Sequence, residues 1–165
     1  MKHLFSVRHG SCNSNHLSKF GEYQISILSE SIKDIVDCQS VYLISSTAKR
    51  ALESSEIIVS KLGLETFEKD AFLWPRPGVA NSMEHYRGSW HDDALVDIVN
   101  RIKDKADGII VVSHLEVANA LVKKYMELYN IDSKFIELDK AQAGHFDLGS
   151  NSYQILPDKS VYRSE

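Results

Sequence analysis

The chain contains 165 residues, 43% of them hydrophobic and 25% charged, which is typical of one globular domain with a buried core. We therefore expect a single domain over residues 1–165. The formal net charge of −4 and the absence of a run of lysines and arginines argue against nucleic acid or an anionic membrane as a partner.

The amino terminus begins with a short apolar run, Leu4 to Val7, which predicts a buried strand. This run is too short for the hydrophobic region of a signal peptide, and no later stretch approaches the length of a transmembrane helix. Cys12 and Cys38 lack CxxC spacing and are too few for a disulfide framework. We therefore expect a cytoplasmic protein.

The next segment, residues 10–27, is rich in serine, asparagine and glycine. This composition predicts an active-site loop with room for a short helix. Helical spacing of apolar residues resumes at Ile32, Ile35 and Val36. A long functional loop is therefore expected between the first strand and this helix.

A second apolar run, residues 41–45, predicts another strand, and the chain then favours a helix from Ala48 to Leu62. Small and apolar residues form one stripe of this helix. Ser46 is the expected N-cap and Gly63 the expected stop. Arg50 lies off the stripe, in the first turn, from which its side chain can lean toward the ends of the strands.

The second half of the chain continues the alternation. Residues 70–91 hold both tryptophans and all but one of the prolines, and we expect an ordered loop that carries specificity. A helix is predicted over 92–106, then a strand that ends at His114, then a helix to about Tyr129. Three further strands are predicted, with at least one antiparallel edge: residues 135–138, 144–148 and 153–156.

Short β-branched runs that alternate with helices predict a mostly parallel sheet, and such sheets bind ligands beyond the carboxyl ends of their strands. Arg8 and His9 follow the first strand, Arg50 follows the second, and His114 follows the strand over 108–113. We therefore expect two arginines and two histidines to converge at one edge of the sheet.

These polar residues belong to four short motifs. The motifs are Arg8-His9-Gly10 followed by Asn15, the segment Ser45 to Ala51 that contains Arg50, Glu84-His85-Tyr86-Arg87-Gly88, and Val112-Ser113-His114. Together they resemble the motifs of the histidine phosphatase superfamily, the phosphoglycerate-mutase-like enzymes. The resemblance runs from residue 4 to residue 121. It implies a three-layer α/β domain with a mostly parallel central sheet flanked by helices.

A phosphoryl group in transfer needs fixed positive charge around its oxygens, which Arg8 and Arg50 can supply as bidentate donors. The resemblance implies that His9 is the nucleophile and becomes a covalent phosphohistidine, while His114 contacts the phosphoryl oxygens. Glu84 is our candidate for the acid that protonates the leaving group and then activates water. The resemblance implies no metal and no cofactor.

Two residues are assigned to substrate binding rather than to chemistry. Asn15 can donate an amide hydrogen bond to a phosphoryl oxygen, and Leu115 follows the second histidine. Many members of the superfamily carry Gly at the position of Leu115, and Glu or Gln at the position of Ser11. These departures keep a second hypothesis open, a phosphate-recognition module of the same fold without turnover.

The predicted function is hydrolysis of a phosphomonoester or a phosphoramidate, with a small phosphorylated molecule or a phosphohistidine protein as the partner. A phosphoglycerate-mutase-type phosphotransferase is a further alternative, but a mutase must shield its phosphoenzyme from water with more covering structure than this length readily supplies. The seven histidines prompt a rival, a metal-dependent hydrolase, but the chain has no HxxxH or HxH pair. The sequence does not predict the oligomeric state.

Several other charged residues are candidates for the site. Glu53 and Glu116 are the alternative acids. Lys49, Arg76 and Arg87 could bind a second anionic group of the substrate, although surface charge explains each of them more simply. The remaining histidines are interpreted as structural or exposed: His3, His16, His85, His91 and His145.

Overall fold

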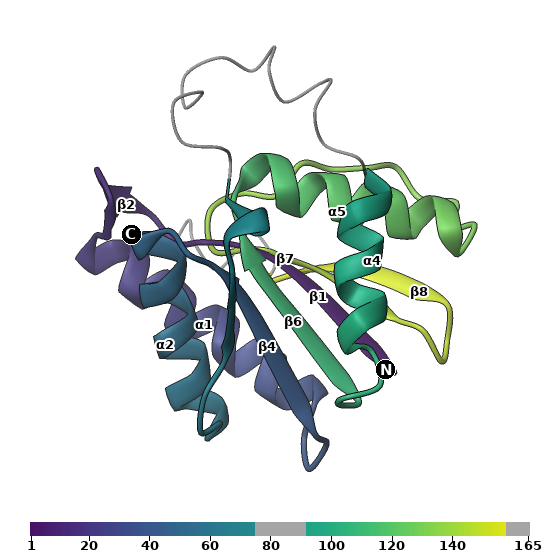
Figure 1. Ribbon diagram of the computed structural model, residues 1–165, viewed down its shortest axis with the longest axis horizontal. Helices are drawn as coiled ribbons and strands as arrows, with labels where there is room; N and C mark the ends of the chain where they lie inside the picture. The colour runs from purple at the N-terminus through teal and green to yellow at the C-terminus, as the bar shows by residue number, and fades with distance from the viewer. Residues whose placement is uncertain (75–91, 158–165) are drawn as a thin grey trace.

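The structure, a computed structural model, describes residues 1–74 and 92–157 and has a six-stranded sheet at its centre, in the order β5-β4-β6-β1-β7-β8 (Figure 1). The strands are β1 (His3–Arg8), β4 (Val41–Ser46), β5 (Glu68–Asp70), β6 (Gly108–Ser113), β7 (Ala143–Asp147) and β8 (Ser152–Leu156). The four strands from β5 to β1 are parallel, and β7 and β8 continue the sheet antiparallel. This confirms the predicted mostly parallel sheet with an antiparallel edge.

Helices cover both faces of the sheet, as predicted for a three-layer α/β fold. Helices α1 (Lys19–Ile35) and α2 (Lys49–Leu62) pack on one face, and α4 (Asp92–Ile102) and α5 (Leu115–Leu128) on the other (Figure 1). The 3₁₀ helix η1 (Ala71–Leu73) follows β5, and a small hairpin of β2 (Cys12–Asn13) and β3 (His16–Leu17) follows β1. None of the helices in residues 1–74 and 92–157 has the length and apolarity to cross a membrane.

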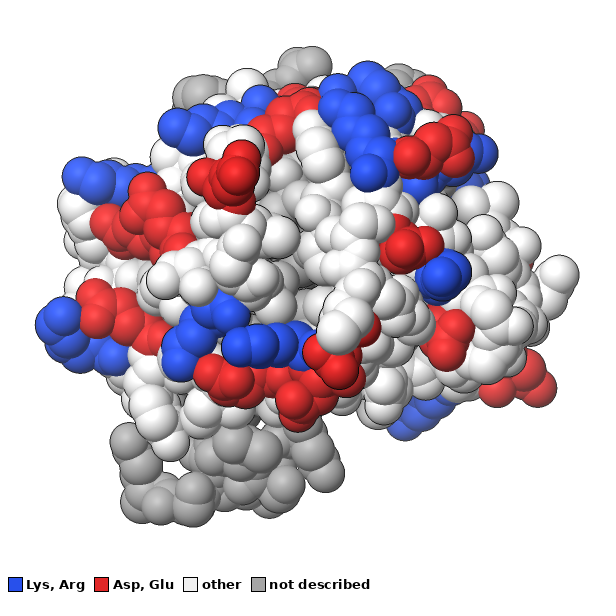
Figure 2. Space-filling model, turned by 90° about the horizontal axis from the view of Figure 1, so that it is seen from below, with Lys and Arg blue, Asp and Glu red and all other residues white. Residues whose placement is uncertain are grey.

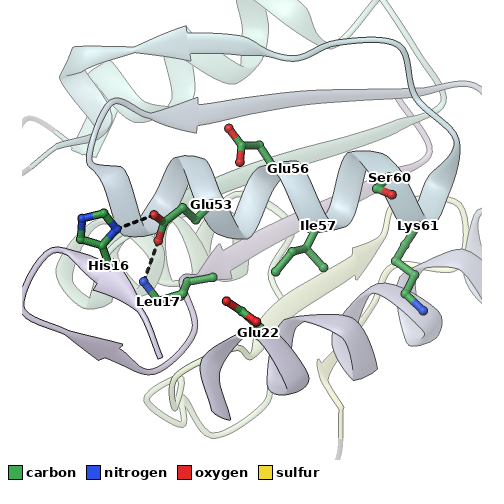
Figure 3. Close-up of a pocket in the computed structure, with 8 residues that line it drawn as sticks. All are labelled: His16, Leu17, Glu22, Glu53, Glu56, Ile57, Ser60 and Lys61. Atoms are coloured by element: carbon green, nitrogen blue, oxygen red, sulfur yellow. Dashed lines mark hydrogen bonds and ion pairs between the residues drawn. The ribbon is translucent and has the colours of Figure 1, made fainter. Parts of the chain in front are cut away.

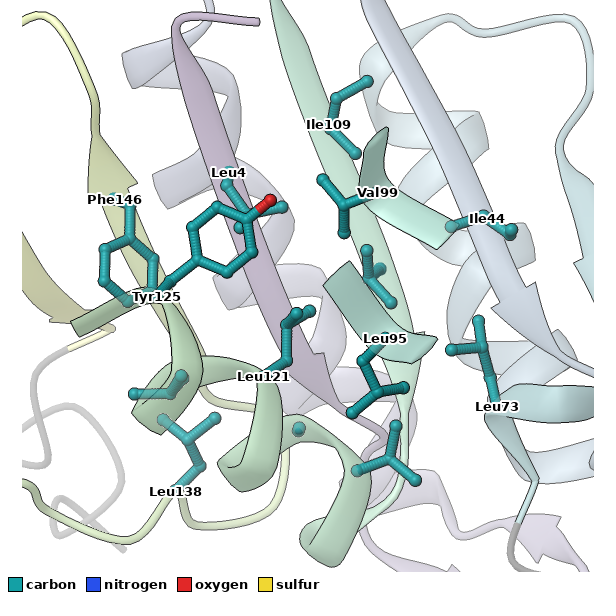
Figure 4. Close-up of a cluster of buried hydrophobic side chains, with 14 of the residues drawn as sticks. Leu4, Ile44, Leu73, Leu95, Val99, Ile109, Leu121, Tyr125, Leu138 and Phe146 are labelled. Carbon is teal, nitrogen blue, oxygen red and sulfur yellow. The ribbon is translucent and has the colours of Figure 1, made fainter. Parts of the chain in front are cut away.

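Burial on both faces explains the unbroken apolar runs in the sequence. In β6, Ile109 and Val111 point toward α4 and α5, whereas Ile110 and Val112 point toward α1 and α2. Figure 4 shows the hydrophobic cluster between the sheet and helices α4 and α5, in which Leu121 of α5 and Leu95 of α4 contact the sheet. A central strand of a parallel sheet therefore has no polar face to present to water.

Helix α1 begins much earlier than the sequence suggested. The second half of the predicted loop over residues 10–27 is helical from Lys19, so that part of the prediction is wrong. Ser18 caps the helix by accepting a hydrogen bond from the Gly21 N–H at 3.0 Å. Gly21 is required by packing, because a Cβ there would lie 2.0 Å from the Ser11 carbonyl oxygen. The glycine that indicated a loop instead lets α1 lie against the backbone that follows β1.

The strand predicted over residues 135–138 is absent. The N–H of Leu138 donates to Asn119 Oδ1 at 3.1 Å, and its carbonyl accepts a hydrogen bond from Arg8 at 2.8 Å. Side chains thus use the backbone groups that a strand would pair with its neighbour, and the prediction is wrong for that reason. The helix predicted over 92–106 is present but ends at Ile102.

Charge is distributed without a dominant sign on the face of the molecule that Figure 2 shows. Lysine and arginine side chains lie among aspartates and glutamates over that face. Opposite charges also form ion pairs, for example Lys61 with Glu30 at 2.8 Å and Arg101 with Glu68 at 2.7 Å.

Candidate active site

The parallel strands β1, β4 and β6 bring three segments to one edge of the sheet. His9 follows β1, Arg50 lies in the first turn of α2 after β4, and His114 follows β6. The rings of His9 and His114 lie 5.1 Å apart between centroids and meet edge to face. Arg50 donates a hydrogen bond to each of them. Residues 41 positions and more apart in the chain therefore form one cluster, called here the His-Arg cluster.

His9 is buried and held in one tautomer. Its Nδ1 lies 2.8 Å from the Gly10 carbonyl oxygen and must donate to it, and its Nε2 accepts a hydrogen bond from Arg50 Nε at 3.0 Å. Burial lowers the pKa of His9 to about 4, and the positive charges of Arg50 and Arg8 act in the same direction, although the bond to Gly10 opposes them. At neutral pH the ring is uncharged and its Nε2 lone pair faces the cluster.

Close backbone packing fixes the position of the Gly10 carbonyl. A Cβ at Gly10 would lie 2.7 Å from the carbonyl oxygen of Gly21, so only glycine fits against α1. The Gly10 N–H donates to Ser54 Oγ at 3.3 Å, and Ser54 in turn donates to the Arg50 carbonyl at 2.8 Å. The loop after β1 is therefore held between α1 and α2.

His114 is also buried and neutral, with its proton on the opposite nitrogen. Arg50 Nη2 lies 3.3 Å from His114 Nδ1, and because a guanidinium can only donate, that nitrogen accepts. The proton is therefore on Nε2, which donates to Ser46 Oγ at 3.0 Å. Burial lowers the pKa of His114 to about 2, and nearby His9, Arg50 and Arg8 act in the same direction.

The amino-terminal end of α2 lacks a side-chain cap. Ser46 was the predicted N-cap, but Ala48 occupies that position and Ser46 Oγ instead accepts from the Ala48 N–H at 3.3 Å. Within residues 1–74 and 92–157, the N–H groups of Lys49 and Arg50 have no acceptor. Unpaired N–H groups and the helix dipole favour an anion at this point, beside the guanidinium of Arg50.

Arg8 lies at the side of the cluster. Its Nη1 donates to the Leu138 carbonyl at 2.8 Å, and its charge lowers the pKa of both His9 and His114. Burial lowers the pKa of Arg8 itself. Its Nε is buried without a hydrogen-bond partner in the described part of the chain, which is a costly state for a donor. A bound anion would satisfy such a donor.

Trp74, which the sequence analysis did not single out as a site residue, contacts the cluster. Its ring lies 5.2 Å from that of His114 between centroids, edge to face, and Arg50 Cζ lies 5.3 Å from the centroid of the indole. The expected specificity loop over residues 70–91 included Trp74, but no motif marks it. Trp74 directly follows η1, and the sequence offered no other signal than a tryptophan inside that expected loop.

Comparisons with solved structures identify this architecture. The chain is similar to the protein histidine phosphatase SixA complexed with tungstate, with a TM-score of 0.63, 17% identity and coverage of 93% of each chain. It is similar to a phosphoserine phosphatase from Entamoeba histolytica, with a TM-score of 0.65, 16% identity and coverage of 94% of this chain and 95% of that one. This chain has the histidine phosphatase fold.

The chain is similar to the same degree to a mycobacterial glucosyl-3-phosphoglycerate phosphatase, with a TM-score of 0.63, 15% identity and coverage of 88% of this chain and 92% of that one. Neither the models of protein families nor the curated proteins gave a match to the sequence. The similarity of this chain to known proteins is therefore a similarity of fold and not of sequence.

The other predicted site residues occupy different places in this histidine phosphatase fold. Asn15 is exposed at the tip of the β2-β3 hairpin and lines a pocket beside Trp74. Leu115 is the half-buried first residue of α5. Glu84 lies outside the described residues, as do His85 and His91.

Glu53, one of the alternative acids, fastens the hairpin to α2. Its carboxylate accepts from His16 Nδ1 and from the Leu17 N–H, each at 2.7 Å (Figure 3). Burial raises the pKa of Glu53, but these two hydrogen bonds and the nearby charges of His16 and Lys49 together hold the pKa below its usual value. A carboxylate that is ionised and fully engaged is a poor proton donor. Glu116, the other alternative, is half-buried in the first turn of α5.

In the part of the chain that the structure describes, no group of three or more His, Cys, Asp or Glu side chains is arranged to hold a metal ion.

Proposed function

We propose that this protein is a phosphatase that hydrolyses a phosphomonoester or a phosphoramidate through a covalent phosphohistidine on His9. The observation that carries the proposal is the tautomer of His9. Its Nδ1–H is committed to the Gly10 carbonyl at 2.8 Å, so Nε2 carries the lone pair that an imidazole nucleophile needs. Burial keeps the ring neutral, which keeps that lone pair available at physiological pH.

Arg50 connects nucleophile and electrophile. Its Nε donates at 3.0 Å to the same lone pair that would attack phosphorus. Phosphoryl oxygens are stronger acceptors than imidazole, so a bound phosphoryl group would take over the donors of Arg50 and leave His9 Nε2 free to attack in line. Arg8 Nε and the N–H groups at the start of α2, which have no acceptor among the described residues, supply further donors for the equatorial oxygens.

His114 would gain charge when the substrate binds. Its Nδ1 faces the space that Arg50 also faces, and its Nε2–H is held by Ser46. A dianionic phosphoryl group beside Nδ1 favours the protonated ring, because an opposite charge stabilises imidazolium. His114 would then donate to a phosphoryl oxygen as negative charge develops there.

Glu84 remains our proposal for the proton donor to the leaving group. The engaged carboxylate of Glu53 argues against that residue, which leaves Glu84 and Glu116 as candidates. The acid is identified with Glu84→Gln and Glu116→Gln, each assayed on an alkyl phosphate and on an aryl phosphate. Loss of the acid slows alkyl phosphates far more, because an aryl leaving group departs with little protonation. Equal losses on both substrates would exclude the residue tested.

The solved structures of this fold support a phosphatase over the alternatives. One is named a protein histidine phosphatase and others are named phosphatases of small phosphorylated molecules. The partner proposed for this chain is accordingly a small phosphorylated molecule or a phosphohistidine protein.

The test is hydrolysis of 4-nitrophenyl phosphate in the presence of a chelator, with vanadate binding measured in parallel. We expect turnover by the wild-type protein and by His145→Asn, whose ring is bonded to His3 and Gln154 rather than to the cluster, and none by His9→Ala. Vanadate binding without turnover would identify a phosphate-recognition module instead. Transfer of the phosphoryl group to an added alcohol faster than to water would identify a phosphotransferase. Loss of turnover in the presence of chelator would identify a metal-dependent hydrolase.

A further inference from the structure

The pocket beside Trp74, which Asn15 also lines, adjoins the His-Arg cluster. It has a volume of about 470 Å³, and Asn15, Thr47, Lys49 and Trp74 are among the residues that line it. These residues come from the β2-β3 hairpin, from the start of α2 and from the end of η1. None of the three motif residues His9, Arg50 and His114 lines it, so it is distinct from the position of the phosphoryl group.

The pocket is joined to the cluster through three of its walls. Trp74 contacts both His114 and Arg50. Lys49 directly precedes Arg50 at the uncapped end of α2. Ala48, another lining residue, donates through its N–H to Ser46, the residue that holds His114. A group bonded to a phosphoryl oxygen at the cluster can therefore extend into this pocket.

The charge of the lining indicates what that group is. Lys49 lines the pocket, and no carboxylate among the described residues does so. A neighbouring pocket of about 580 Å³, on the other side of His16, has the opposite character, because Glu22, Glu53 and Glu56 line it (Figure 3). Its lysine, Lys61, is already paired with Glu30 at 2.8 Å. An anion is thus attracted to the pocket lined by Lys49 and Trp74 and repelled by the pocket lined by the three glutamates.

We propose that the pocket beside Trp74 is the subsite for the leaving group of the substrate, and that this group carries a second negative charge, a carboxylate or a second phosphate, which Lys49 binds. The inference rests on the proposed function in taking the phosphoryl group to lie at His9 and Arg50. Trp74 forms an apolar wall for the carbon skeleton between the two charged ends. Lys49, interpreted from the sequence as ordinary surface charge, becomes a specificity residue.

The experiment measures binding of non-hydrolysable phosphonates by calorimetry. The probes are the 3- and 4-carboxyphenylphosphonates, the carboxamide of each, and phenylene-1,4-bisphosphonate. Carboxylate and carboxamide have nearly the same shape, so their difference reports the charge alone. The variant is Lys49→Gln. Lys61→Gln is the matched control, since it removes a lysine from the last turn of the same helix, outside this pocket.

We expect the wild-type protein and Lys61→Gln to bind at least one carboxylate about fivefold more tightly than its carboxamide, as a partly solvated ion pair contributes. Lys49→Gln should abolish this preference and leave carboxamide binding unchanged. Tighter binding of the bisphosphonate than of either carboxylate would assign a second phosphate, and the reverse order a carboxylate. No charge preference in the wild type for any probe, or one that survives Lys49→Gln, would overturn the proposal.

Failure of this inference and failure of the proposed function can be told apart, because phosphonates bind without being hydrolysed. A charge preference that depends on Lys49 in a protein that fails to turn over 4-nitrophenyl phosphate would contradict the phosphatase and keep the subsite. Turnover without the preference would contradict the subsite alone.

Discussion

Among the described residues, two pairs of neighbouring histidines each contain a buried ring, and the two pairs differ in chemistry. His9 and His114 lie at the carboxyl ends of β1 and β6, whereas His3 and His145 lie side by side on β1 and β7, with His3 at the opposite end of β1. His9 exposes 6% of its surface and His145 4%. Burial lowers the pKa of each to about 4. Neither burial nor a lowered pKa therefore distinguishes a nucleophile from a structural residue.

The partners of the ring nitrogens make the distinction. His145 Nδ1 accepts from the amide of Gln154 at 3.1 Å, so its Nε2–H donates to His3 Nδ1 at 3.1 Å. Its ring is stacked on Phe5 with centroids 4.5 Å apart. Both nitrogens are satisfied by neutral side chains, and no lone pair remains for chemistry. At His9 the Nε2 lone pair accepts from the guanidinium of Arg50, a donor that a bound phosphoryl group would take over.

The sharpest way to break this comparison is to remove each histidine in turn. We expect His9→Asn to lower kcat on an aryl phosphate by roughly a thousandfold or more, because the nucleophile is lost. His145→Asn should stay within a few-fold of the wild type per folded molecule. Steady-state kinetics on both variants, corrected for folded fraction by circular dichroism, makes the measurement. Similar losses in the two variants would contradict the assignment of His9 as the nucleophile.

The role of the charged partner is tested at Arg50. Arg50→Ala should raise the barrier in kcat/KM by about 2–4 kcal/mol, the effect of losing a preorganised electrostatic contact in a transition state. Arg50→Lys should recover little of this, since an ammonium cannot donate to His9, His114 and a phosphoryl group in one plane. Lys61→Gln, in the last turn of the same helix and outside the site, serves as the control and should change kcat/KM little. Full activity of Arg50→Lys would show that a point charge suffices.

The pair formed by His3 and His145 should instead contribute to the stability of the protein. We expect His145→Ala to lower the free energy of unfolding by about 2–3 kcal/mol, because it removes a stacked ring and leaves Gln154 and His3 without their partner. Urea denaturation measures this change. Full stability with loss of activity would reverse the assignment of the two pairs.

One histidine of each pair, His9 and His145, contributes to the dependence of stability on pH. An unfolded histidine has a pKa of about 6.5, whereas His9 and His145 have a pKa of about 4 in the folded protein. Between these values the unfolded chain binds more protons, so the free energy of unfolding falls as the pH is lowered. Each group contributes about 1.4 kcal/mol per pH unit. Urea denaturation from pH 6.5 to 4.5 should give a shallower slope for His145→Gln than for the wild type, and an unchanged slope would contradict the neutral buried ring.

The elements that the sequence predicted well are those in which periodicity and burial agree. The apolar runs of β1, β4 and β6 are buried on both faces, and the polar residues that follow them had only one edge of the sheet to occupy. This is why Arg50 and His114 could be placed beside His9 from the sequence. The fold class followed from the same alternation of strands and helices.

The elements that were missed depend on contacts between distant residues. Gly21 indicated a loop, yet it serves the packing of α1 against Ser11. Residues 135–138 have the composition of a strand, yet Asn119 and Arg8 form hydrogen bonds with the backbone groups of Leu138. Trp74 carries no motif, and only the path of the chain after β5 brings it to Arg50. Such pairings have no local signature in a single sequence.

The most direct test of the central claim is the position of the phosphate in a trapped intermediate. The enzyme is mixed with an aryl phosphate, quenched in base and examined by phosphorus NMR and peptide mapping, with His9→Asn and His145→Asn in parallel. Because Nδ1 of His9 is committed to the Gly10 carbonyl, we expect an acid-labile phosphoramidate on Nε2 of His9, present in the wild type and His145→Asn and absent from His9→Asn. A phosphoryl group on Nδ1, on another residue, or on no residue while turnover continues would contradict the account.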